Sequence, residues 1–185
     1  ACKGICGSDI EFIGSRRGAG VDEDRARFSS LFDEHYRSVF AFVLRRVDTT
    51  QTAQDLTEDV FLVAWRKLDD VPPDPESLYW LYGVARRIVA NHSRKTANRT
   101  RLAPRLVTVA PLSAPPPEDV VVRNDEARFV IEGLEELRDT DQELLRLAYW
   151  DDLPRRVIGE LLGISESAVS VRLHRAVRRL GKALR

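Results

Sequence analysis

The chain has 185 residues, a length that fits one or two domains, and its 29 lysines and arginines balance 29 aspartates and glutamates. No apolar run is long enough to cross a bilayer, so we expect no transmembrane helix. The only two cysteines, Cys2 and Cys6, have no histidine near them in the sequence. The four ligands of a typical zinc site are therefore missing there, and we expect neither a metal nor another cofactor.

Residues 1–20 are unpatterned and show no apolar signal region. Their dipeptides Gly7-Ser8, Asp9-Ile10 and Glu11-Phe12 are those that consecutive cloning sites encode. We therefore interpret residues 1–20 as a tail derived from a cloning linker and exclude them from the fold.

Three helices are expected between residues 21 and 102, which form the first predicted domain. The first helix is expected to start at Phe28, and its apolar stripe comprises Phe28, Leu31, Phe32, Tyr36, Val39, Phe40, Val43, Leu44 and Val47. The apolar stripe of the second helix runs from 52 to 68. Prolines then break the chain between Val71 and Pro75, and Ser77 is a suitable cap for the third helix.

Residues 103–126 are rich in proline and hold no helical or strand period, which indicates an extended linker. Helical patterns resume over residues 127–185, the second predicted domain. The predicted fold class is therefore all-α, with two small helical domains joined by an extended linker.

A helix-turn-helix is predicted in the second domain. A short helix from Pro154 to Leu162 precedes Gly163, which permits the positive φ of a helix end, and Ser165 is a good cap for the next helix. An ordinary helical hairpin with a solvated basic face is the alternative. The residues expected to face outward are Ser167, Ser170, Val171, His174, Arg175, Arg178 and Arg179.

The charges form bands that indicate two kinds of partner. Residues 48–76 hold eight acids and two bases, whereas residues 79–105 hold seven bases and no acid. Residues 155–185 hold eight bases and two acids. Basic bands suit phosphate, and an acidic band suits a basic protein surface.

Four segments resemble conserved parts of the extracytoplasmic-function, or group IV, bacterial sigma factors. Asp55–Trp65 and Trp80–Arg87 resemble region 2 of that family, and Asp141–Leu145 and Val169–Leu180 resemble region 4. The resemblance implies a sigma factor that binds core RNA polymerase, recognises the −35 and −10 promoter elements and promotes DNA melting.

The resemblance also implies residue roles. Region 2 would dock on the clamp helices of polymerase, with region 4 near the flap, and the expected polymerase-binding residues are Asp55, Glu58, Asp59 and Phe61. Glu58-Asp59 stands where relatives carry Gln-Glu. The loop Asp69–Glu76 would hold an extruded −10 base, and the single strand would contact Arg86, Arg87, Asn91, Arg94 and Lys95. Trp80 and Tyr82 are candidates for base stacking, with core packing favoured for Trp80.

Region 4 would read the −35 duplex through the second helix of the helix-turn-helix. Ser170 stands where relatives often carry Arg, and Ser cannot make the bidentate guanine contact of Arg. The expected −35 contacts are Arg155, Ser167, Ser170, Val171, His174, Arg175 and Arg178.

Family membership further implies an anti-sigma protein as a partner and a cytoplasmic location, associated with the nucleoid in the holoenzyme. No Gly-rich phosphate loop, nucleophile motif or metal cluster is found, so we do not expect an enzyme. The alternative function is a one-component helix-turn-helix regulator that acts as a dimer without polymerase, with residues 28–102 as a sensing domain. The acidic-then-basic layout of residues 48–105 disfavours it, because a sensor does not need that layout.

Overall fold

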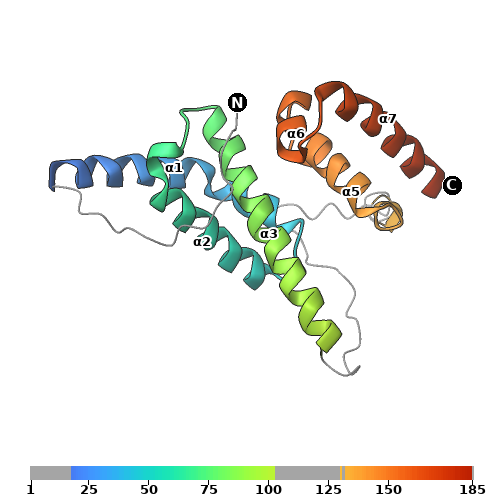
Figure 1. Ribbon diagram of the computed structural model, residues 1–185, viewed down its shortest axis with the longest axis horizontal. Helices are drawn as coiled ribbons and strands as arrows, with labels where there is room; N and C mark the ends of the chain where they lie inside the picture. Colours follow the sequence, from blue (N-terminus) through green and yellow to red (C-terminus); the bar gives the residue numbers. More distant parts are fainter. Residues whose placement is uncertain (1–17, 103–129, 131, 185) are drawn as a thin grey trace. The chain divides into compact units, whose positions relative to one another are not determined.

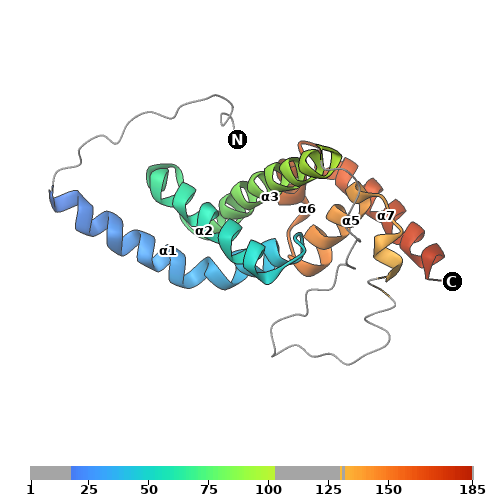
Figure 2. The same cartoon turned by 90° about the horizontal axis from the view of Figure 1, so that it is seen from below.

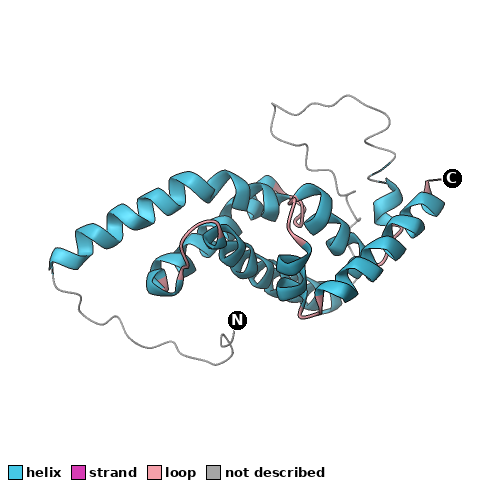
Figure 3. Cartoon of the chain, turned by 90° about the horizontal axis from the view of Figure 1, so that it is seen from above, coloured by secondary structure: helices cyan, strands magenta, loops and turns pink. Residues whose placement is uncertain are grey.

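The computed structural model describes residues 18–102, 130 and 132–184. Within those ranges the chain forms helices and connecting loops and no strand, which confirms the all-α prediction (Figure 3). The described residues belong to two compact units, with residues 18–102 in one and residues 130 and 132–184 in the other. The linker at 103–126, the tail up to residue 17 and both cysteines lie outside the described residues.

The first unit consists of three helices that pack against one another in every pairing: α1 (Gly18–Leu44), α2 (Thr50–Arg66) and α3 (Glu76–Leu102) (Figures 1 and 2). α1 starts earlier than the predicted Phe28, and its residues 18–20 fall within the predicted tail 1–20, which was therefore drawn too long. Thr49 caps α2, because its Oγ1 accepts a hydrogen bond of 3.1 Å from the backbone amide of Thr52. After α2 comes a short 3-10 helix, η1 (Leu68–Asp70), and a proline-rich loop leads into α3.

The core of the first unit is apolar and partly aromatic. Phe42, which the predicted stripe leaves out, is fully buried and stacks on Tyr82 with ring centroids 4.5 Å apart. Phe40, which the stripe includes, is only half-buried. The buried arc of α1 is wide because this helix packs against both α2 and α3. The apolar residues of this unit with no exposed surface are Val39, Phe42, Val43, Ala53, Val60, Ala64, Leu81 and Ala85.

The second unit is built on α5 (Asp139–Leu145), the π-helical turn η3 (Arg146–Trp150), α6 (Arg155–Leu162) and α7 (Glu166–Ala183). Residues 132–135 are also helical. α7 packs against both α5 and α6. Its buried face meets a core whose main members are Leu144, Leu145, Leu147, Val157, Ile158, Val169, Leu173 and Ala176.

The turn between α6 and α7 confirms the predicted helix-turn-helix. Gly163 has a φ of 67°, the left-handed conformation that glycine adopts without a Cβ penalty. Ser165 caps α7, since its Oγ accepts a 3.2 Å hydrogen bond from the amide of Ala168. Gly159, inside α6, is buried, and a Cβ built there would lie 2.7 Å from the carbonyl oxygen of Ile164. The two helices can therefore join this tightly only with glycine at position 159.

Candidate nucleic-acid interface

The outward side of α2 is acidic. Asp55, Glu58 and Asp59 are exposed, on the side of the helix opposite its buried stripe, and Leu62 lies among them with 51% of its surface exposed. The Nε2 of Gln51 donates a 2.9 Å hydrogen bond to the Asp55 carboxylate. We call Asp55, Glu58, Asp59 and Leu62 the acidic face of α2. Leu62 was missed as a site residue, although its place one turn after Glu58 puts it on the same side.

Phe61 does not belong to this surface. Its side chain is only 3% exposed and packs edge-on against Phe32, with ring centroids 4.8 Å apart, and also against Tyr36 and Phe28. The prediction that Phe61 contacts polymerase is therefore wrong. The neighbouring buried residue Val60 shows why, because the apolar stripe of α2 is wide enough to include position 61.

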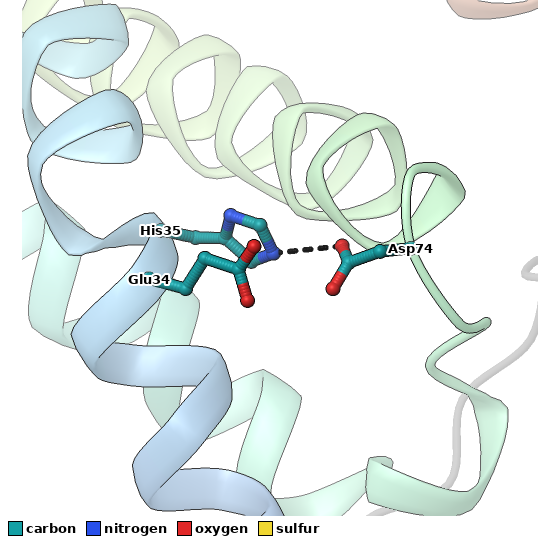
Figure 4. Close-up of side chains that lie close together, drawn as sticks. All are labelled: Glu34, His35 and Asp74. Carbon is teal, nitrogen blue, oxygen red and sulfur yellow. Dashed lines mark hydrogen bonds and ion pairs between the residues drawn. The ribbon is translucent and has the colours of Figure 1, made fainter.

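The loop Asp69–Glu76 is tied to α1. Arg27 donates from Nη2 to the carbonyl oxygen of Val71 at 2.8 Å. The Nε2 of His35 lies 3.0 Å from Asp74 Oδ1 (Figure 4). It also lies 3.0 Å from Ser77 Oγ, and the Ser77 hydroxyl donates to the same Asp74 oxygen. Ser77 is therefore not the cap that the sequence suggested. It lies in the first turn of α3 and is buried, and its hydroxyl bonds the loop and α1.

These contacts act on the charge of Asp74. The hydrogen bond from Ser77 lowers the pKa of Asp74 most, and the hydrogen bond and charge of His35 add to this, whereas partial desolvation opposes it. Glu34 approaches the same group, so one ligand atom each from Glu34, His35 and Asp74 lies within 4.8 Å of the others (Figure 4). Such a set has the donors for a cation, but His35 Nε2 is already engaged by Asp74 and Ser77.

α3 presents a polar stripe beyond this loop. Arg87, Asn91 and Arg94 are exposed and follow one another at four- and three-residue steps, which places them on one face. Arg94 Nη2 donates to Asn91 Oδ1 at 2.5 Å. Lys95 is exposed beside them, and Arg86 is half-buried.

The two aromatic candidates at the start of α3 differ in exposure. Tyr82 is 5% exposed and stacked on Phe42, so it is not available to a base. Trp80 is half-buried, and thus neither fully in the core nor fully at the surface.

The exposed face of α7 holds most of the predicted −35 contacts. Ser167, Val171, His174, Arg175 and Arg178 are exposed there, opposite the buried Val169, Leu173 and Ala176. Arg155 is exposed at the first turn of α6.

Three neighbouring residues of α7 differ from these. Ser170 is half-buried, and its hydroxyl donates to the Glu166 carbonyl oxygen at 3.2 Å within the helix. Arg179 is exposed, as expected, and forms an ion pair with Asp141 of α5 at 2.5 Å. Val177 is 42% exposed.

Two family models match the two units separately. The model of sigma-70 region 2 matches residues 31–99, and that of sigma-70 region 4 matches residues 130–180, well over half of the chain together. The chain is 28% identical over 180 residues to the ECF RNA polymerase sigma factor SigK of Mycobacterium tuberculosis H37Rv, covering 96% of this chain and 94% of the relative. The chain belongs to the extracytoplasmic-function sigma factors. It is also 27% identical over 158 residues to the sigma factor BldN of Streptomyces coelicolor, matching 85% of this chain but only 60% of BldN.

Solved structures show the same fold for this sigma factor. The sigma factor RpoE of Bartonella quintana, solved with the anti-sigma factor NepR, matches with a TM-score of 0.61 at 18% identity, over 90% of this chain and 96% of that one. CnrH, solved with the cytosolic domain of CnrY, matches with a TM-score of 0.62 at 21% identity, over 90% and 92%. No helix among the described residues has the length and apolar character needed to span a membrane. The family identifies promoter recognition with RNA polymerase as the function, and the one-component regulator is not supported.

Proposed function

We propose that this sigma factor uses three separate surfaces to bind polymerase and to recognise the promoter. The acidic face of α2 binds core polymerase, the loop Asp69–Glu76 with the α3 stripe holds the melted −10 strand, and α7 reads the −35 duplex. The single observation that supports this division best is the charge on the first unit. α2 turns carboxylates outward, whereas the exposed stripe of α3 carries Arg87, Asn91 and Arg94 and no acid.

The acidic face of α2 suits a basic protein surface such as the polymerase clamp helices. Complementary charges raise the rate of encounter and fix orientation more than they raise affinity. Leu62 adds an exposed apolar side chain at the C-terminal end of the acidic face. We therefore keep Asp55, Glu58 and Asp59 as proposed polymerase-binding residues, and we add Leu62 to them in place of Phe61. The contact with the polymerase flap is assigned to the second unit.

The melted −10 strand is assigned to the α3 stripe, with Arg86 and Lys95 at its sides. Holding a base outside the stack costs a few kcal/mol of unstacking, which phosphate contacts and a fitted pocket must offset. Arg94 orients the Asn91 side chain through its 2.5 Å hydrogen bond, so the amide of Asn91 is set before a base arrives. Half-buried Trp80 starts the same helix near the loop, and we assign it to packing beside the bound strand.

The −35 duplex is assigned to α7, because a single helix fits the major groove. His174 and Arg175 offer hydrogen bonds to base edges, and Val171 offers an apolar contact of the kind that a thymine methyl makes. Arg155 and Arg178 are assigned to phosphates. Ser170 contributes little to base reading, since its hydroxyl is bonded within the helix.

The decisive experiment combines the sigma factor with core polymerase and measures promoter-specific initiation. Asp55→Lys with Asp59→Lys should abolish core binding and initiation while the circular dichroism of the chain is unchanged. The matched control is Asp33→Lys with Asp48→Lys, an equal change of charge at two exposed residues outside α2. Equal core affinity of the two double variants would refute the docking assignment.

An anti-sigma protein is the proposed regulator. The solved relatives RpoE and CnrH were each captured with a partner, NepR and the cytosolic domain of CnrY. A partner that covers the acidic face of α2 would block core binding directly. We place the sigma factor in the cytoplasm, on the nucleoid when bound to polymerase, and assign nucleotidyl transfer to polymerase itself.

A further inference from the structure

The loop Asp69–Glu76 holds few hydrogen bonds of its own. Three of its eight residues are prolines, which carry no amide hydrogen. The amides of Asp70, Val71 and Glu76 bond to nearby carbonyl groups, those of Lys67, Leu68 and Pro73, at 2.9, 3.2 and 3.1 Å. These bonds close local turns. The buried side chain of Val71 anchors the start of the loop in the core, and side chains of α1 add contacts to the scaffold.

α1 supplies these contacts at both ends of the loop. Arg27 holds the Val71 carbonyl oxygen at 2.8 Å, and His35 reaches Asp74 and Ser77 at 3.0 Å each. Arg27, Leu31 and His35 follow at four-residue steps, so they share one face of α1. Leu31 is buried between them, which holds this face against the unit.

The hydrogen-bond directions in this network are consistent with one another. The Ser77 hydroxyl donates to Asp74, so the carboxylate accepts, and His35 donates towards the same carboxylate when it carries a proton on Nε2. His35 is 6% exposed and was not among the residues expected to act. His35 and Asp74 are 39 positions apart in the sequence. A hydrogen bond from a buried side chain of α1 to the loop therefore orders the loop relative to that helix.

We propose that Arg27 and His35 are positioning residues that set the base selectivity of the −10 loop without touching DNA. We call these two residues the α1 clamp. The inference rests on the proposed role of Asp69–Glu76 in holding an extruded base. A recognition pocket must be held to within about half an ångström of its productive geometry, and this depends on residues outside the first contact layer. Without the α1 clamp, binding of the base would have to order the loop, at a cost in binding free energy. We expect the pocket then to discriminate less well between the correct base and the other three.

The test measures open-complex formation by the holoenzyme on promoters that carry each of the four bases at each −10 position of the non-template strand. Discrimination is the ratio between the preferred base and the others. His35→Leu removes the hydrogen bonds, whereas His35→Gln keeps an N–H donor at similar reach. Arg27→Ala removes the hydrogen bond to the Val71 carbonyl oxygen at the other end of the loop. Because Arg27 is exposed, its loss should leave the fold intact. Arg37→Ala, at another exposed arginine of α1, is the matched control.

We expect His35→Leu and Arg27→Ala each to lower discrimination about tenfold at one −10 position, within the range that a single mismatched base pair carries. His35→Gln should recover most of it, and Arg37→Ala should match the wild type. Core affinity and −35 binding should be unchanged in all four variants, which separates positioning from general damage. Should His35→Leu fail to fold, Arg27→Ala decides the matter by itself.

Two results would overturn different claims. If the wild-type holoenzyme discriminates but Arg27→Ala, and His35→Leu where it folds, do so equally well, the α1 clamp has no positioning role. If the wild type shows no base preference at any −10 position, the proposed function of the loop itself fails.

Discussion

Arg179 of α7 and Asp141 of α5 form an ion pair, with Nη1 and Oδ2 2.5 Å apart. The Asp141 side chain is 11% exposed and the Arg179 side chain 48% exposed. Asp141 also lies in the first turn of α5, where a negative charge suits the helix dipole. The pair thus fixes α7, the proposed DNA-reading helix, against α5, and Arg179 is structural although it neighbours the proposed phosphate contact Arg178.

The first prediction concerns this pair. Arg179→Gln leaves the mostly buried Asp141 carboxylate without its partner and should lower the free energy of unfolding of the second unit by about 1–2 kcal/mol. Arg178→Gln, one residue away and exposed, should stay within about 0.5 kcal/mol of the wild type. Amide hydrogen exchange of α5 and α7 measures both. Additive effects of Arg179→Gln and Asp141→Asn in the double variant would show that the pair contributes nothing.

The second prediction concerns the glycines of the second unit. Gly159→Ala places a Cβ 2.7 Å from a backbone oxygen of the turn, which must shift, so we expect a loss of about 1–3 kcal/mol. Gly181→Ala meets nothing within 4 Å and should be neutral or stabilise α7 by up to about 1 kcal/mol. Thermal unfolding of the two variants gives the comparison. Equal melting temperatures would mean that α6 and the turn do not approach as closely as described.

The helix-turn-helix was predictable because its signals are local. Gly163 and Ser165 specify a helix end and a helix start within three residues, and the structure places both as expected. Phe61 was not predictable in the same way. Similarity to a family motif gives the register of α2 but not the width of its buried arc, which depends on packing by α1.

The α1 clamp lies further beyond sequence reasoning. Arg27 meets Val71 across 44 positions, and His35 meets Ser77 across 42. Nothing in the local pattern of α1 distinguishes a buried histidine that bonds a loop from one at the surface. The prediction that Ser77 caps α3 failed for a related reason. A serine can cap a helix or bond a neighbouring element, and which it does depends on where the helix begins.

The third prediction separates phosphate from base contacts on α7. If Arg178 binds a phosphate, Arg178→Ala should weaken −35 binding by the holoenzyme about equally for all sequences and reduce the salt slope by about 1. Arg172→Ala, on the flank of α7 away from the proposed groove face, should leave the slope unchanged. The affinity is measured between low and physiological salt on two or more −35 sequences. A loss confined to one sequence would instead make Arg178 a base contact.

The fourth prediction concerns the pH dependence of the loop. The pKa of Asp74 lies below its ordinary value of 3.8, chiefly because Ser77 donates a hydrogen bond to the carboxylate, with His35 adding to it. A carboxyl with a lowered pKa stabilises the fold fully above its ordinary pKa, and this contribution disappears as the pH falls through the lowered value. The stability difference between the wild type and Asp74→Asn should therefore shrink in acid below 3.8.

The same network predicts the order of effects on Asp74 itself. Besides Ser77 and His35, the carboxylate of Glu34 lies close to this group. Ser77→Ala should raise the pKa of Asp74 towards 3.8 by more than His35→Leu does, because the serine hydrogen bond is the largest cause of the shift. Carboxyl NMR titration measures this directly, with Ser93→Ala as a control at an exposed serine of α3. An unchanged Asp74 titration in Ser77→Ala would mean that the hydroxyl does not donate to this carboxylate, and the loop would then depend on His35 alone.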